Sequence, residues 1–142
     1  MNFRHAGIVT QNIEELILFY KNALGFSIKK DVLETGEFVS SICGLSNIKV
    51  RTVKMSLNDN IVLELLDFKN VDNSCNSERN ITDKGYTHMA LTVSNLDKLY
   101  SSMLKEGVHF TTKPLISPDG NAKVTFCKDP DGNLLELVEE LK

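Results

Sequence analysis

Val62-Leu63-Glu64-Leu65-Leu66 and its counterpart Leu134-Leu135-Glu136-Leu137-Val138 each set one glutamate in the middle of an aliphatic run. In a β-strand, residues i−2, i and i+2 lie on the same face. Both glutamates therefore share a strand face with aliphatic side chains. Because an unpaired charge is costly to remove from water, each carboxylate is expected to need a partner.

The chain contains an internal repeat with a constant offset. Asn12 lies seven residues after His5, and Asn95 lies seven residues after His88. Each residue of the second pair is therefore 83 positions after its counterpart in the first (88 − 5 and 95 − 12). Asn and Asp residues typical of turns come directly before both glutamate-bearing segments. The repeat predicts two copies of one supersecondary unit.

Each copy is predicted to have the element order βαβββ. Apolar residues at helical spacing follow Asn12, which is expected to cap the helix with Glu15 at the capping-box position. Gly25 and Gly107 are placed to end the two helices. Strands are expected at residues 3–10, 26–31, 48–56 and 60–68, then at 86–93, 108–113, 122–128 and 133–139, with a helical turn near 39–44 and the second helix at 96–106.

The predicted fold class is α+β, with two tandem modules in one domain. Residues 1–68 form the first βαβββ module, the polar segment 69–84 is the linker, and residues 85–142 form the second module. A chain of 142 residues is long enough to bury a core for such a domain.

Composition narrows the classes of partner. The net charge of −3 and the absence of a Lys/Arg stripe argue against nucleic acid, and no apolar run has the length of a membrane span. Three cysteines without a CxxC pair favour neither a disulfide framework nor a zinc ribbon. A reducing cytoplasm is therefore expected.

Four polar residues occupy matching positions in the two copies: His5 and Glu64, then His88 and Glu136. Taken singly, each histidine could be a hydrogen-bonded core residue, and each glutamate an edge-strand charge that blocks aggregation. Their duplication favours a shared role. If the terminal strands of each module are neighbours, the two imidazoles and two carboxylates converge. Such a set of ligands suits one divalent ion: Zn, Ni, Co, Mn or Fe(II).

Several motifs carry a family resemblance: His5-Ala6-Gly7-Ile8-Val9, Phe19-Tyr20 through Leu24-Gly25-Phe26, His88 through Val93, and Asp129-Pro130-Asp131-Gly132-Asn133-Leu134-Leu135-Glu136-Leu137. With them the chain resembles the vicinal oxygen chelate superfamily, which includes glyoxalase I, extradiol dioxygenases and bleomycin resistance proteins. The resemblance implies a curved, open mixed-sheet cup around a metal held by the same four residues. It also implies a homodimer, with each metal site inside one chain or shared between two.

The resemblance implies a metal-dependent isomerase or lyase of glyoxalase type, similar to lactoylglutathione lyase. Such an enzyme acts on a small vicinal-oxygen substrate through a metal-stabilised enediolate. Glu136 is the first candidate for the carboxylate that moves the proton, and Glu64 is the second. Val9 and Phe68 stand where glyoxalase I has an arginine and an asparagine for glutathione, which argues against glutathione as the substrate.

Two other functions stay open. An extradiol-type dioxygenase would hold Fe(II) with His5, His88 and Glu136, and a small-molecule binding or resistance protein would keep the cup without chemistry. Arg51 lies in the middle of a predicted strand and is a weaker candidate for contact with an anionic substrate.

Overall fold

The computed structural model describes residues 1–58, 60–72 and 80–142, with the backbone alone for residues 60–62. The chain divides into two compact units, Met1–Asn76 and Ser77–Lys142. The division falls inside the predicted linker at 69–84, of which residues 73–79 lie outside the described part of the chain.

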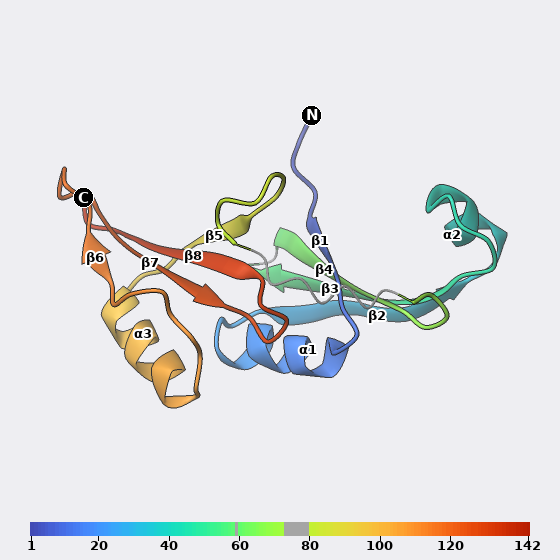
Figure 1. Cartoon of the computed structure of the whole chain (residues 1–142), viewed down its shortest axis with the longest axis horizontal. Helices are drawn as coiled ribbons and strands as arrows, with labels where there is room; N and C mark the ends of the chain where they lie inside the picture. Colours follow the sequence, from blue (N-terminus) through green and yellow to red (C-terminus); the bar gives the residue numbers. More distant parts are fainter. Residues whose placement is uncertain (59, 73–79) are drawn as a thin grey trace. The chain divides into compact units, whose positions relative to one another are not determined.

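The first unit is a four-stranded mixed sheet with two helices (Figure 1). Its strand order is β1-β4-β3-β2, with β1 parallel to β4 and the other neighbours antiparallel. The elements are β1 (Ala6–Val9), α1 (Ile13–Asn22), β2 (Ser27–Thr35), α2 (Glu37–Ile42), β3 (Lys49–Leu57) and β4 (Asn60–Phe68).

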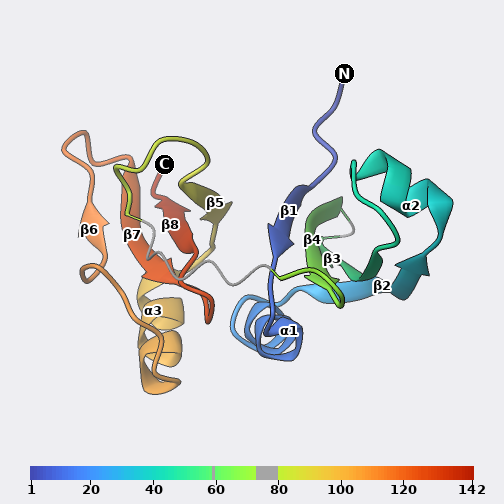
Figure 2. The same ribbon diagram turned by 45° about the vertical axis from the view of Figure 1, so that its right-hand side comes forward.

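The second unit repeats this topology with one helix (Figure 2). Its strand order is β5-β8-β7-β6, and β5 runs parallel to β8. The elements are β5 (His88–Thr92), α3 (Leu96–Lys105), β6 (Leu115–Ile116), β7 (Ala122–Lys128) and β8 (Leu134–Glu140). The predicted α+β class and the βαβββ order of both halves are confirmed, and the helical turn predicted near 39–44 corresponds to α2.

The strand predicted at 108–113 is wrong. In that segment Phe110 forms only an isolated bridge with Cys127, and the short strand β6 begins after Pro114. Proline has no N–H to donate to a ladder, so regular pairing resumes beyond it. The first predicted strand, at 3–10, is also shorter than expected and covers only Ala6–Val9.

The long helices differ at their N-termini. Asn95 Oδ1 accepts a hydrogen bond from Lys98 N at 2.9 Å, as a helix cap should. Asn12 makes no side-chain cap bond, which corrects the predicted capping box; instead its own N–H donates to Thr10 Oγ1. No helix within the described ranges is long and apolar enough to cross a membrane.

Each sheet buries one face under a helix. Helix α1 packs against β4, and the buried side chains include Leu16 and Tyr20 of the helix and Leu63 and Leu65 of the strand. In the second unit α3 packs against β8, where Leu135 and Leu137 are buried. The alternation of strand side chains therefore leaves the even-numbered residues of β4 and β8 on the other face.

Candidate metal centre

The first unit brings His5 and Glu64 together. Glu64 lies in β4 directly opposite Gly7 of β1, and His5 stands two residues before Gly7, so both side chains lie on one sheet face. His5 Nε2 is 3.2 Å from Glu64 Oε2, and the Glu64 side chain is 14% exposed. The parallel β1–β4 pairing therefore joins the first predicted histidine to the first predicted glutamate.

The second unit brings His88 and Glu136 together in the same register. Glu136 lies in β8 directly opposite Ala90 of β5, and His88 stands two residues before Ala90. His88 Nε2 is 3.5 Å from Glu136 Oε2. Each unit thus supplies one imidazole and one carboxylate from its two parallel strands.

Charged contacts show that both glutamates face away from the long helices. Arg51 shares the buried face of the first sheet and binds Glu14 of α1, while Lys123 shares the buried face of the second and binds Asp97 of α3. Glu64 and Glu136 alternate with those buried positions, so their carboxylates lie on the sheet faces opposite α1 and α3.

The predicted apolar neighbours of the glutamates are present in part. Leu134, two residues before Glu136, is buried, and Leu66, two residues after Glu64, packs in a cluster with Val39 of α2. The side chain of Val62 lies outside the described part of the chain. Both carboxylates are therefore partly withdrawn from water, as the sequence predicted.

The two carboxylates differ in their cross-strand neighbours. Lys54 of β3 lies opposite Glu64, and its Nζ is 3.2 Å from Glu64 Oε1. Phe126 of β7 lies opposite Glu136, and its ring meets the His88 ring edge-on with centroids 5.3 Å apart. Neither neighbour was predicted from the sequence, because each depends on the register of a hairpin.

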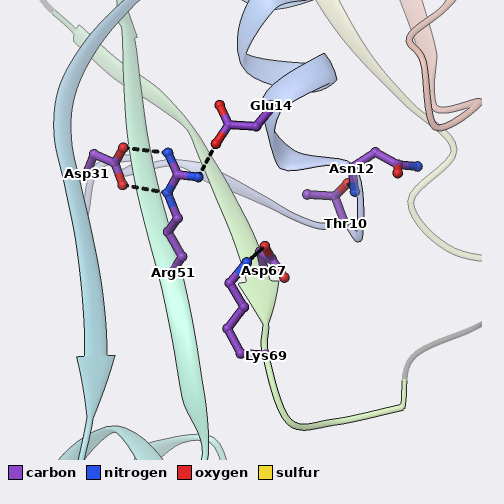
Figure 3. Close-up of polar contacts among 7 residues, drawn as sticks. All are labelled: Thr10, Asn12, Glu14, Asp31, Arg51, Asp67 and Lys69. Carbon is purple, nitrogen blue, oxygen red and sulfur yellow. Dashed lines mark hydrogen bonds and ion pairs between the residues drawn. The ribbon is translucent and has the colours of Figure 1, made fainter.

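The structure does not bring Arg51 together with Glu64. As Figure 3 shows, the guanidinium binds both carboxylate oxygens of Asp31, at 2.9 and 2.8 Å, and also Glu14. Asp31 and Glu14 raise the pKa of Arg51, and hydrogen bonds from Arg51 lower the pKa of the Asp31 carboxyl. Arg51 thus links β2, β3 and α1.

The four predicted ligands suit a divalent metal by their chemistry. Imidazole nitrogen and carboxylate oxygen are ordinary ligands of Zn and of other first-row ions. Within either unit, the described residues hold no group of three or more His, Cys, Asp or Glu able to ligate a metal.

The chain belongs to the Glyoxalase/Bleomycin resistance protein/Dioxygenase superfamily, whose family model matches residues 2–137. It is 28% identical to the uncharacterized protein YwkD of Bacillus subtilis, over 98% of this chain and 97% of that protein. It is 24% identical to a lactoylglutathione lyase of Neisseria meningitidis, over 99% of this chain and 91% of the lyase.

Solved structures show the same fold. A glyoxalase family protein from Bacillus cereus matches with a TM-score of 0.90 and 20% identity, over 100% of this chain and 95% of that protein. Glyoxalase I of Leishmania major matches with a TM-score of 0.66 and 21% identity, over 99% of this chain and 87% of the enzyme. The predicted family and the glyoxalase-like fold are therefore confirmed.

Proposed function

We propose that this protein is a divalent-metal-dependent isomerase or lyase of glyoxalase type that acts on a small substrate with vicinal oxygens. The main support is the duplicated His–Glu pair, which lies at the same register in each unit, on the sheet face opposite the long helix. Two such pairs, joined within one chain or between the two chains of a homodimer, supply two nitrogen and two oxygen ligands. Similarity to a lactoylglutathione lyase supports the reaction class.

The four side chains have distinct proposed roles. His5 and His88 would hold the metal through Nε2, and Glu64 and Glu136 through carboxylate oxygens. The metal would supply a Lewis acid that stabilises the negative charge of an enediolate. Glu136 would take a proton from the carbon beside one substrate oxygen and return it to the adjacent carbon, which leaves the electron count unchanged.

The neighbours of the two carboxylates favour Glu136 over Glu64 as the base. Lys54 lies 3.2 Å from Glu64 and compensates its charge, so Glu64 is held in place. Glu136 faces Phe126 across the ladder, and an aromatic ring offers no ammonium to pair with the carboxylate. The structural asymmetry thus matches a fixed ligand in the first unit and a proton carrier in the second.

Metal analysis of the wild type and Glu136→Gln tests the proposal. We expect about one equivalent of metal per chain in the wild type, and weakened binding or lost turnover of 2-oxoaldehyde–thiol adducts in the variant. Glu140→Gln is the matched control, because Glu140 is an exposed residue of the same strand and the charge change is equal.

Three results would contradict this function. Equal metal content and equal turnover in the wild type and Glu136→Gln would remove the role of Glu136. Oxygen uptake with a catechol that depends on Fe(II) would assign the chain to the dioxygenases instead. A ligand that binds without turnover, and regardless of chelator, would indicate a binding protein.

A further inference from the structure

A row of charged residues crosses three strands on the sheet face that carries Glu64. Lys54 lies directly opposite Glu64 in the β3–β4 ladder, and Lys30 lies directly opposite Lys54 in the β2–β3 ladder. The Lys54 side chain is 26% exposed, and its Nζ lies 3.2 Å from Glu64 Oε1. The row therefore has two ammonium groups for one carboxylate.

Lys54 opposite Glu64 is a stabilising pair of opposite charges, so sheet pairing accounts for only part of this row. Like charges directly opposite each other destabilise an antiparallel pair, yet Lys30 and Lys54 are such a pair. In the second unit Phe126 occupies the position that corresponds to Lys54, and the ladder there forms without an ammonium. The module can therefore form without a lysine at this position.

Charge balance then indicates what Lys54 would bind once a metal is held. A divalent ion held by Glu64 would share the negative charge of that carboxylate with Lys54, so Glu64 would no longer balance the charge of Lys54 by itself. Glu34, which β2 places on the same face as Lys54, accepts a hydrogen bond from Thr52 Oγ1 at 2.6 Å. The partly exposed Lys54 side chain would then carry a positive charge that a further anion could balance.

We propose that Lys54 binds an ionised oxygen of the substrate, and that the substrate is a small anion with a carboxylate or phosphate group beside its vicinal oxygens. This inference rests on the proposed metal-dependent function. Lys30, exposed at the outer end of the row, adds to the positive potential that attracts such an anion.

Calorimetric titration of the metal-loaded full chain tests this substrate class. The three probes share one hydroxyketone group: dihydroxyacetone is neutral, hydroxypyruvate adds a carboxylate, and dihydroxyacetone phosphate adds a phosphate. The variants are Lys54→Met, Lys54→Arg, which keeps the charge, and Lys49→Met, a control that removes an exposed lysine from the other face of β3. Metal affinity is measured first for every variant.

We expect the wild type to bind at least one charged probe about tenfold or more tightly than dihydroxyacetone. Lys54→Met should lose this preference while it binds metal at least as tightly as the wild type, because a repelling ammonium is gone. Lys54→Arg and Lys49→Met should keep the preference. The favoured charged probe distinguishes a carboxylate substrate from a phosphate substrate.

Equal binding of all three probes to the metal-loaded wild type would overturn the anionic substrate and leave the metal site intact. A preference that survives in folded Lys54→Met would overturn the role of Lys54. If Lys54→Met does not fold, Lys54→Gln, which also removes the charge, takes its place in the same comparison. A wild type that binds no metal would overturn the proposed function, and this inference with it.

Discussion

Arg51 of β3 connects its strand to β2 and to α1 through ion pairs. Its guanidinium binds Asp31 of β2 through two hydrogen bonds and Glu14 of α1 through an ion pair. A bidentate guanidinium–carboxylate pair is stronger and more directional than an ordinary surface ion pair. The pKa of Asp31 lies below its usual value because Arg51 donates to the ionised carboxylate.

Asp31→Asn is expected to lower the free energy of unfolding at neutral pH by up to about 1 kcal/mol, since the pair is partly exposed and screened by solvent. The folded-state pKa of Asp31 is depressed, so the stabilisation is present above the unfolded pKa of about 3.9 and is lost as the pH falls through the folded value. Urea denaturation of both proteins at pH 7 and near pH 3 measures this.

The difference between the wild type and Asp31→Asn should thus shrink in acid. Glu14→Gln is a graded comparison, because the Glu14 side chain is 70% exposed and its loss should cost less. A difference that stays constant from pH 7 to pH 3 would show that ionisation of Asp31 does not stabilise the fold.

The residue scale also shows which parts of the site could be predicted. The strand pattern alone identified His5, Glu64, His88 and Glu136, because alternation and repetition are local properties of a sequence. Lys54 could not be selected that way, since its role depends on which residue faces it across a hairpin. The partners of Arg51 could not be predicted from the strand pattern either, because the β2–β3 ladder contains a register shift between Ile28 and Lys30.

At the scale of elements, side chains from two parts of the chain accept hydrogen bonds from the N-terminus of α3. Asn95 accepts from Lys98 N, and Glu139 of β8 accepts from Leu96 N at 2.9 Å. Carboxylate and amide oxygens at this end accept hydrogen bonds from the unpaired N–H groups of the first turn, and a negative charge there interacts favourably with the positive end of the helix dipole. The buried side chains of Leu96 and Met103 then fix α3 to its sheet.

Asn95→Ala is expected to lower the free energy of unfolding by about 1 kcal/mol, because a free backbone N–H loses its acceptor. Asn95→Ser is the matched control, since a serine oxygen can also cap and should restore most of the stability. Thermal or urea unfolding of the three proteins measures the difference. Equal losses in the alanine and serine variants would show that the side-chain cap contributes little.

Regular elements were more predictable than irregular ones. The helices at residues 13–22 and 96–105 have apolar spacing and end near Gly25 and Gly107, whose φ values of 76° and 83° suit glycine. The segment 108–113 has a strand-like composition, but only tertiary pairing decides whether it forms a ladder. There Thr111 N donates to Phe126 O and Thr125 Oγ1 donates to Thr112 O, an irregular pattern that composition cannot show.

At the scale of the whole molecule, a metal shared by the two units would couple their stabilities. A ligand that binds only the folded chain stabilises it by about 2.7 kcal/mol when its concentration is a hundred times the dissociation constant. We therefore expect divalent metal to raise the unfolding midpoint of the wild type and a chelator to lower it. His5→Ala in the first unit and Glu136→Gln in the second should each abolish most of that shift.

Unfolding curves with and without chelator measure this effect, and Glu140→Gln should respond like the wild type. A metal-dependent shift that survives in His5→Ala but not in Glu136→Gln would place the ion in the second unit alone. The predicted homodimer stays a prediction, and sedimentation of the metal-loaded and metal-free protein tests whether the ion also joins two chains.

The parallel pairing within each sheet has a consequence for the order in which the protein can be made. Strand β1 pairs with β4, and β5 pairs with β8. The first strand synthesised in each half therefore cannot form this pairing until the last strand of that half has been synthesised. Contacts between residues so far apart in sequence slow folding. A nascent half cannot bring its histidine beside its glutamate until that half is fully translated, so the ability to capture an ion would arise late in biosynthesis.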